Sequence, residues 1–250
     1  MSDFDAVAAW YDLLAGGPAR VERESNLLLL ALGPGQRVLD LACGTGLHAR
    51  FFADHGASVT AVDLSEAMLR VARAIRDHPA IRWVQGSMLD TPSGPWDLVT
   101  CLGNSIALLA SPDDVTRFFQ RAADVLAPGG ALLAQLLNGA GTAWRLDRDR
   151  EVHATLNGMP VTIRKRWQFQ KATDISLNVL LTVERWDPPR DTPAERVETL
   201  LRLWYPEFLE AQARATGLLP ESRWGGMVLE PYIPEDSPDY VCLGRKPALE

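Results

Sequence analysis

Two glycines and one carboxylate have the spacing of a nucleotide-binding loop. Gly44 and Gly46 lie where an apolar segment, residues 37–42, gives way to a helical pattern. Neither glycine has a Cβ, so the backbone can turn tightly there and approach a ligand closely. Asp63 follows about twenty residues later at the end of the next apolar segment, where a carboxylate can accept hydrogen bonds from both ribose hydroxyls. The pattern predicts a site for an adenosine-containing ligand.

The same residues leave two ligand classes open. Gly44, Gly46 and Ala49 followed by an acid also satisfy the dinucleotide fingerprint, so an NAD(P)-dependent oxidoreductase remains an alternative. A tight turn with only a structural role is a third interpretation. The combination of strand, turn, helix and acid argues against that third interpretation, because a turn alone would not need the carboxylate.

The elements around this loop predict an α/β fold. Apolar segments of strand length recur at residues 37–42, 58–62, 81–84, 98–102 and 131–137, with helical patterns between most of them. Strands that are continuously apolar are buried on both faces, and their alternation with helices indicates parallel strands joined by right-handed crossovers. With two final strands near Ser222 and Tyr240, we expect a doubly wound, Rossmann-like, seven-stranded and mostly parallel sheet.

Local signals mark several helix ends and turns. Ser65 is placed to cap a helix that runs to about residue 77, with Leu69, Ala72 and Ile75 on its buried side. Asp113 is placed to open the helix before the fifth strand. The Pro-Gly-Gly run at residues 128–130 predicts a type II turn that leads into that strand.

After the fifth strand the apolar pattern changes to a period of two. Residues 139–205 therefore predict a small antiparallel β insertion, with a hairpin turn at Asn157 and Gly158. The flanking segments, residues 1–138 and 206–250, then form the main domain, and 206–216 reads as a helix. The insertion can serve as a lid, an acceptor platform or a homodimer interface. Its tryptophans favour a buried surface of some kind, namely Trp144, Trp167, Trp186 and Trp204.

Composition excludes several classes of protein. The 250 residues are 47% hydrophobic and 23% charged, which is typical of an ordinary folded domain. No apolar run near the start approaches the roughly 20 residues of a membrane helix, and no lysine-led leader is visible, so we expect no membrane partner and a cytoplasmic location. Three widely spaced cysteines fit neither a disulfide framework nor a metal site, and a net charge of −7 disfavours nucleic acid.

Four motifs resemble those of the class I S-adenosylmethionine-dependent methyltransferases. They occur in the family's order within residues 36–137, reading DLACGTG at 40–46, DLSEAML at 63–69, GSM at 86–88 and LAPGG at 126–130. The resemblance implies S-adenosyl-L-methionine as cofactor and S-adenosyl-L-homocysteine as product. The glycine loop would approach the methionine portion, Asp63 would hold the ribose, and Leu64, Met68 and Met88 would flank the adenine.

One departure from the family pattern concerns Ser87, which stands where many members have an Asp that accepts from the adenine amine. Related enzymes hold the cofactor's carboxylate with an Arg near the N-terminus, and here Arg20 and Arg23 both qualify. Tyr11 can close over the cofactor or pack against Trp10. The full set of cofactor-binding residues that the resemblance implies is Tyr11, Arg20, Ala42, Cys43, Gly44, Gly46, Asp63, Leu64, Met68, Ser87, Met88 and Leu102.

Within that class, the chain resembles glycine N-methyltransferase and the amino-sugar N-methyltransferases. The resemblance lies in CLGNSIALL at 101–109, LLN at 136–138 and LRLWYP at 201–206. It implies a small polar amine as methyl acceptor, bound by Asn104, Asn138, Arg202, Tyr205 and Tyr232. The strand parity of Arg202, opposite to that of its leucine neighbours, instead favours a solvent-facing side chain.

Methyl transfer from a sulfonium is an in-line displacement that needs no protein nucleophile, so no catalytic residue is assigned. Oxygen or carbon acceptors remain the alternative for the methyl group. A regulatory protein that binds the cofactor without turnover is a further alternative.

Overall fold

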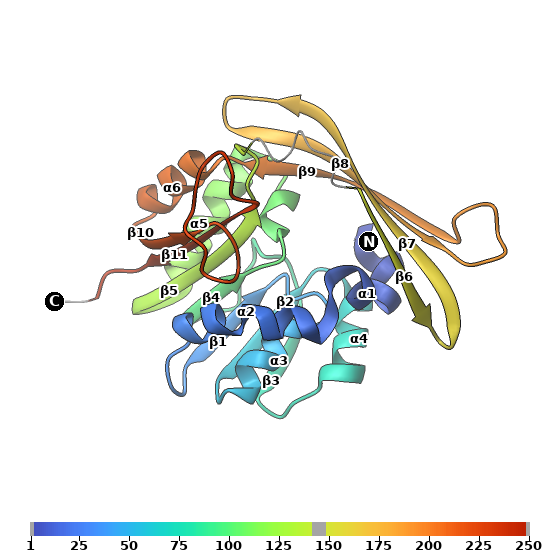
Figure 1. The fold of residues 1–250 in the computed structure, drawn as a ribbon. Helices are drawn as coiled ribbons and strands as arrows, with labels where there is room; N and C mark the ends of the chain where they lie inside the picture. Colours follow the sequence, from blue (N-terminus) through green and yellow to red (C-terminus); the bar gives the residue numbers. More distant parts are fainter. Residues whose placement is uncertain (1–2, 142–148, 249–250) are drawn as a thin grey trace.

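A computed structural model describes residues 3–141 and 149–248 of the chain. Its larger sheet has seven strands in the order β10-β11-β5-β4-β1-β2-β3 (Figure 1). Strands β3, β2, β1, β4 and β5 run parallel, and β11 is antiparallel to both β5 and β10. The predicted seven-stranded, mostly parallel sheet is therefore confirmed. The strand bounds are β1 (Arg37–Leu41), β2 (Ser58–Asp63), β3 (Ile81–Gln85), β4 (Trp96–Cys101), β5 (Leu126–Leu137), β10 (Leu219–Trp224) and β11 (Asp239–Arg245).

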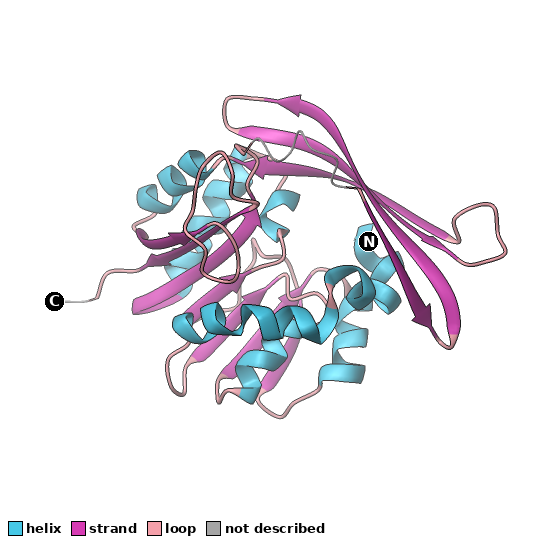
Figure 2. Cartoon of the chain, in the orientation of Figure 1, coloured by secondary structure: helices cyan, strands magenta, loops and turns pink. Residues whose placement is uncertain are grey.

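Helices cover both faces of this sheet (Figure 2). Apolar side chains of α2 and α3 pack on one face and those of α5 and α6 on the other, as in a doubly wound fold. No helix of the described residues is both long and apolar enough to cross a membrane. The helix bounds are η1 (Asp3–Trp10), α1 (Tyr11–Ala15), α2 (Gly17–Ala31), α3 (Leu47–Asp54), α4 (Glu66–Arg76), η2 (Ser105–Leu108), α5 (Pro112–Val125) and α6 (Pro206–Ala215).

Two details of the predicted helices need correction. Ile75 is 57% exposed, and the next residue, Arg76, is buried in its place because its guanidinium pairs with Asp12 of α1. Helix α5 is capped by Ser111, whose hydroxyl accepts from the backbone N–H of Asp114, so Asp113 lies in the first turn rather than at the cap. In the first case a buried ion pair outweighs the apolar periodicity, and in the second Ser111 supplies the cap two residues before Asp113.

A second sheet follows β5 in the chain and contains four antiparallel strands in the order β6-β7-β8-β9. Asn157 and Gly158 both have positive φ, 51° and 80°, as the predicted hairpin turn requires. The predicted antiparallel insertion is confirmed, although its division into a separate domain at 139–205 stays a prediction. Its strands are β6 (Arg150–Leu156), β7 (Met159–Ala172), β8 (Ser176–Trp186) and β9 (Glu195–Trp204).

The inner face of this second sheet packs against the main domain. Buried side chains of β7, β8 and β9 share one core with Val7 and Trp10 of η1, Met68 of α4 and Ala107 of η2. In Figure 1 the four strands lie across the same end of the molecule as η1 and α1. The second sheet and the N-terminal helices thus border the same space. Of the predicted tryptophans, Trp204 is 2% exposed, Trp167 and Trp186 are half-buried, and Trp144 lies outside the described residues.

Four side-chain contacts hold the N-terminal helices in place. The Asp12 carboxylate accepts from the Thr45 hydroxyl at 2.6 Å and from the Arg76 guanidinium. Ser65 donates its hydroxyl to Asp5, and the Trp10 indole donates to Glu195 at the start of β9. Together these contacts join η1 and α1 to the glycine loop, to α4 and to the second sheet.

The cap of α4 is expected to stabilise more than its own helix. Ser65 Oγ accepts from Met68 N–H at 3.1 Å while its hydroxyl donates to Asp5. We expect Ser65→Ala to lower the free energy of unfolding by about 1–2 kcal/mol, measured by urea unfolding. Ser111→Ala removes a cap of the same type without a contact to the N-terminal helices, and we expect a smaller loss. An equal or larger loss in Ser111→Ala would contradict the fastening role of Ser65.

Candidate cofactor and acceptor site

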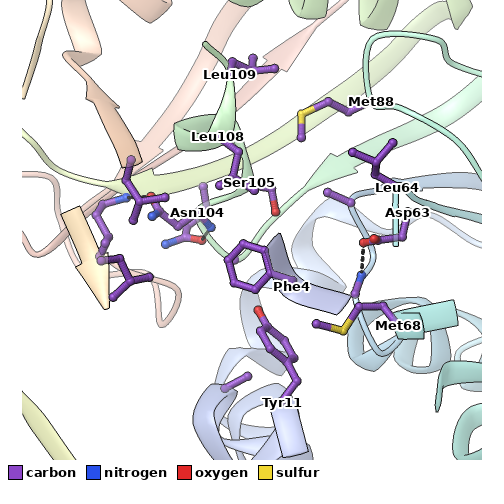
Figure 3. Close-up of a pocket in the computed structure, with 18 of the residues that line it drawn as sticks. Phe4, Tyr11, Asp63, Leu64, Met68, Met88, Asn104, Ser105, Leu108 and Leu109 are labelled. Carbon is purple, nitrogen blue, oxygen red and sulfur yellow. Dashed lines mark hydrogen bonds between the residues drawn. The ribbon is translucent and has the colours of Figure 1, made fainter. Parts of the chain in front are cut away.

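A cavity of about 540 Å³ lies between the carboxyl ends of the parallel strands, the N-terminal helices and the second sheet. Its volume falls within the range of roughly 300–1,000 Å³ that is usual for small-molecule sites. Gly44 and Asp63 line it from the parallel sheet, whereas Trp167, Leu181 and Leu201 line it from the second sheet. Figure 3 shows Asp63, Tyr11 and Asn104 arranged around the same space. Ligands of open α/β sheets bind at this edge.

Asp63 organises the loop at one end of the cavity. Its Oδ2 accepts from Gly44 N–H at 2.7 Å, drawn as the dashed line in Figure 3, and its Oδ1 accepts from Ser65 N–H at 2.8 Å. Burial raises the pKa of Asp63, the two N–H donors lower it, and nearby Asp5 raises it further, with a net rise. Each carboxylate oxygen has a second lone pair, so two acceptor positions remain for ribose hydroxyls.

The two glycines of the loop have different roles. Gly44, with φ of 57°, lines the cavity, and its added Cβ would point toward Tyr11 at 3.7 Å. Gly46, with φ of 83°, is not among the lining residues, and its added Cβ would lie 2.4 Å from the Trp83 ring. Gly44 therefore allows the approach of a ligand, whereas Gly46 allows Trp83 to pack beneath the loop.

The predicted adenine-side residues meet at the same end of the cavity. Leu64, Met68, Ser87 and Met88 all line it. Met68 is only 2% exposed and also fills the core beneath, whereas Leu64 is 61% exposed. Ser87 Oγ accepts from Leu89 N–H at 3.1 Å, so its hydroxyl proton remains to be donated toward the cavity. These side chains can form two apolar walls and one polar edge for a planar base.

Arg20 rather than Arg23 lines the cavity. The two terminal nitrogens of its guanidinium lie 3.8 and 4.0 Å from where a Cβ on Gly103 would stand, at the end of β4. Tyr11 also lines the cavity, and Figure 3 shows its ring and hydroxyl directed into that space. Burial raises the pKa of Tyr11, the charge of Arg20 opposes the rise, and Asp63 and Asp12 add to it. Tyr11 therefore keeps its hydroxyl proton, and Arg20 supplies the positive charge of this wall.

Of the three remaining predicted cofactor residues, only Ala42 lines the cavity. Ala42 lines the cavity with φ of 54°, but Cys43 and Leu102 are not among its lining residues. Burial raises the pKa of the Cys43 thiol well above its usual range, and the charges of Asp40 and Asp63 add to the rise. The thiol of Cys43 is therefore protonated at neutral pH and is not a nucleophile. The described residues contain no cluster of His, Cys, Asp or Glu that could hold a metal ion.

Asn104 is the one predicted acceptor residue that lines the cavity. It adopts a left-handed backbone conformation with φ of 70°, and its Oδ1 accepts from Leu137 N–H at 2.9 Å. Its own N–H donates to Gln135 Oε1 at 3.0 Å. These bonds orient the Asn104 amide so that its Nδ2, which has no partner among the described residues, can donate to a ligand.

The other predicted acceptor residues lie outside the lining of this cavity. Asn138 is fully buried, and its Nδ2 donates to the carbonyls of Pro234 and Ser237, so it fastens the segment before β11. Tyr232 packs edge-on against Tyr240. Arg202 is opposite Asn178 on the outer face of the second sheet, and Tyr205 precedes α6. An acceptor role for these four residues therefore stays a prediction without support from the cavity.

Several lining residues carry no local sequence signal. Phe4 of η1 projects into the middle of the cavity in Figure 3, with its ring centroid 6.2 Å from that of Tyr11. Gln135 enters from β5, and Lys165 and Trp167 enter from β7. Lys165 Nζ lies 4.7 Å from the centre of the Trp167 ring. The sequence predicted a buried surface around Trp167, but it did not predict that the second sheet packs over the glycine loop.

Comparison with known proteins identifies the loop. The methyltransferase domain family matches residues 38–130. The ubiquinone biosynthesis O-methyltransferase of Xanthomonas euvesicatoria is 34% identical over 162 residues, which are 58% of this chain and 64% of the relative. The dTDP-4-amino-2,3,4,6-tetradeoxy-D-glucose N,N-dimethyltransferase of Saccharopolyspora spinosa is 36% identical over 111 residues, 44% of each chain. The matched segments thus span less than two thirds of the length of these relatives.

Solved structures extend the likeness to the whole fold. The CcbJ methyltransferase from Streptomyces caelestis has a TM-score of 0.78 at 24% identity, with 99% of both chains covered. An S-adenosylmethionine-bound amino pentose methyltransferase from Micromonospora echinaspora has a TM-score of 0.68 at 21% identity, covering 91% of this chain and 90% of the other. The family match over residues 38–130 decides between the two ligand classes that the glycine pattern left open. The chain carries an S-adenosylmethionine-dependent methyltransferase domain, with S-adenosyl-L-methionine as its cofactor.

Proposed function

We propose that the protein transfers a methyl group from S-adenosyl-L-methionine to the nitrogen of a small polar amine, such as an amino acid or an amino sugar. The observation that carries the proposal is the shared cavity, because the glycine loop and the second sheet line the same space of about 540 Å³. The cofactor supplies an electrophilic methyl group on a sulfonium. The chain's task is to hold the acceptor nitrogen in line with that methyl group and to exclude water.

In this proposal each end of the cavity holds one reactant. Asp63 accepts from the ribose, Arg20 pairs with the cofactor's carboxylate, and Tyr11 closes over the same end. Asn104 offers its amide Nδ2 to the acceptor, and Trp167 offers an aromatic face from the second sheet. Holding two reactants in a near-attack arrangement can lower a barrier by roughly 7–11 kcal/mol, so positioning alone is a sufficient mechanism.

The titratable groups of the cavity favour nitrogen over oxygen as the acceptor atom. Among the described lining residues there is no histidine, and the two carboxylates are Asp63 and Asp114. Asp63 accepts from two backbone N–H groups, and Asp114 accepts from Ser111 at the start of α5. A hydroxyl acceptor usually needs a base to take its proton, whereas a neutral amine attacks first and loses its proton afterward to water.

The relatives support an amine acceptor without deciding it. The Saccharopolyspora spinosa relative is named as an N,N-dimethyltransferase of an amino sugar, and one solved neighbour is named as an amino pentose methyltransferase. The Xanthomonas relative is named as an O-methyltransferase, so oxygen is the second candidate for the acceptor atom.

We propose action in a reducing compartment such as the cytoplasm, which fits three free thiols. Homodimerisation through the second sheet stays a prediction.

The test is a screen for release of S-adenosyl-L-homocysteine. The protein is incubated with cofactor carrying an isotopically labelled methyl group and with matched pools of amines and of hydroxyl compounds. We expect release with amines, and a labelled product whose nuclear magnetic resonance shift is that of an N-methyl group. Turnover with the hydroxyl pool alone, and a methoxy signal, would overturn the nitrogen assignment. Cofactor binding without turnover in either pool would favour the regulatory alternative.

Trp167 is expected to affect the acceptor more than the cofactor. It lies on the inner face of β7, opposite Leu181, and lines the cavity. We expect Trp167→Ala to raise the KM for the acceptor about tenfold, because an aromatic contact worth about 1–1.5 kcal/mol is lost, while cofactor affinity changes less than about twofold. Trp186→Ala is the matched control, because Trp186 is on the outer face beside Arg164. Equal effects of the two substitutions would argue against an acceptor platform.

A further inference from the structure

A buried ion-pair chain stands behind Arg20 on the side away from the cavity. Arg20 Nε donates to Glu24 Oε1 at 2.7 Å, one turn further along α2. Glu24 Oε2 is 2.8 Å from His48 Nε2 in the first turn of α3. Glu24 is 6% exposed and His48 is 8% exposed. Neither residue lines the cavity, and the proposed methyl transfer uses neither directly.

Buried carboxylates are costly, so this one requires an explanation. Burial opposes ionisation of Glu24, but the hydrogen bonds and charges of His48 and Arg20 outweigh it and lower the pKa of Glu24. Glu24 is therefore an anion at neutral pH, with each of its two oxygens bonded to a different partner. A surface arginine would be stable without such an arrangement, because its guanidinium could remain in water.

The bond from Glu24 uses only one edge of the guanidinium. It occupies Nε, while the two terminal nitrogens of Arg20 are directed toward Gly103 and the cavity. Two parallel N–H donors of this kind match the two oxygens of a carboxylate. Glu24 thus fixes the rotamer and the plane of Arg20 while leaving its ligand-facing edge available. The Arg20 side chain therefore loses its conformational entropy when the protein folds, so this loss does not weaken ligand binding.

His48 connects this arrangement to the glycine loop. It is the second residue of α3, the helix that starts directly after Gly46, and its ring holds the Glu24 oxygen that Arg20 does not use. The loop that approaches the cofactor and the arginine that faces the cofactor's carboxylate are therefore joined through two buried side chains. A shift of α2 relative to α3 would break this connection.

We propose that Glu24 and His48 are positioning residues that hold Arg20 ready for the amino-acid carboxylate of the cofactor. The inference rests on the proposed function in one respect, since it takes Arg20 as the partner of that carboxylate. Its consequence is selective: loss of Glu24 should weaken ligands that carry the carboxylate and spare ligands that lack it. A purely structural role would weaken both kinds of ligand equally.

The test compares two ligands by isothermal titration calorimetry on the full chain. S-adenosyl-L-homocysteine carries the amino-acid carboxylate, and 5′-methylthioadenosine has the same nucleoside without it. We expect Glu24→Gln to weaken S-adenosyl-L-homocysteine about tenfold and 5′-methylthioadenosine less than about twofold. Glu22→Gln, at an exposed position on the same helix, is the matched control and should change neither affinity. Equal weakening of both ligands, or no weakening of either, would overturn the positioning role.

Two more variants keep the outcomes distinct. Arg20→Gln tests whether Arg20 is the partner of the cofactor's carboxylate. If this variant binds S-adenosyl-L-homocysteine as tightly as the wild type, that assignment is wrong, whatever the result for Glu24→Gln. If circular dichroism shows that Glu24→Gln does not fold, two variants of His48 are compared instead. His48→Gln keeps a donor for Glu24 and should retain the preference for S-adenosyl-L-homocysteine, whereas His48→Leu should reduce it about threefold or more. The same preference in both His48 variants would contradict the proposal.

Discussion

Asp63→Ala is expected to weaken S-adenosyl-L-methionine binding by about a hundredfold or more. Two charge-assisted hydrogen bonds to the ribose would be lost, each worth roughly 1.5–3 kcal/mol, and a tenfold change in affinity corresponds to about 1.4 kcal/mol. The substitution also removes the acceptor of the Gly44 and Ser65 N–H groups, which hold the loop in its present conformation. Loop distortion should therefore add to the direct loss. Titration calorimetry measures the affinity directly.

Two companion variants separate these contributions. Asp63→Asn keeps one oxygen acceptor in a side chain of the same shape. We therefore expect its cofactor affinity to lie between those of the wild type and Asp63→Ala. Glu66→Gln removes a carboxylate from the next helix, where Glu66 pairs with Arg73 at the surface, and should leave affinity unchanged. Unchanged cofactor affinity in Asp63→Ala would show that the ribose is not held by this carboxylate.

The second large effect concerns Asp40 and the pH dependence of stability. Asp40 is 2% exposed; one of its carboxylate oxygens accepts from the Thr100 hydroxyl, and the other has no partner among the described residues. Burial raises the pKa of Asp40 to about 6, against the lowering by His48 and by hydrogen bonds from Thr100 and the Ala49 backbone, and Asp63 adds to the rise. Because the folded-state pKa is above the unfolded value, protonated Asp40 favours the folded state.

The sign of the effect follows from that rise. The stabilising contribution of Asp40 is fully present below its unfolded pKa and is lost as pH increases through about 6. A shift of about two pKa units corresponds to at most about 3 kcal/mol. Asp40→Asn removes this titration, so we expect the stability of the variant relative to the wild type to increase by about 2–3 kcal/mol between pH 4 and pH 7. Urea unfolding at stepped pH values measures the difference.

Asp97 provides a control of opposite sign. It accepts hydrogen bonds from the side chain and backbone of Arg37, and these interactions outweigh burial and lower the pKa of Asp97. Its contribution is present above its unfolded pKa and is lost as pH decreases. Asp97→Asn should therefore lose stability relative to the wild type as pH increases through the acid range. The same direction of change in Asp40→Asn would contradict the raised pKa of the buried Asp40 carboxyl.

The contact between Asp63 and the glycine loop was predictable because its geometry is local. Gly44 must follow a buried strand, and Asp63 must end the next strand, for the carboxylate to reach the Gly44 N–H. Both conditions can be read from apolar segments and residue types within about 25 residues, and parallel pairing of β1 with β2 then brings the two together. The parallel direction of these strands follows from the same alternation of strands and helices, whereas their order in the sheet does not.

The acceptor end was less predictable because distant segments decide it. Asn138 does follow a strand end, as expected, but its amide is occupied by carbonyls of Pro234 and Ser237, almost a hundred residues later. Lys165 and Trp167 reach the cavity only because the second sheet packs over η1. Arg76, which displaced Ile75 from the inner side of α4, is buried by its pairing with Asp12. Each of these outcomes depends on tertiary contacts that cannot be predicted from the spacing of apolar residues in the sequence.

The most direct measurement is a crystal structure of the protein with S-adenosyl-L-homocysteine. We expect the adenosine against Asp63, Leu64 and Met88, the carboxylate at Arg20, and the sulfur facing the part of the cavity lined by Asn104 and the second sheet. Such an orientation would place a methyl group where an acceptor can reach it. Ligand bound elsewhere, or a sulfur that faces away from the second sheet, would contradict a single cavity shared by cofactor and acceptor.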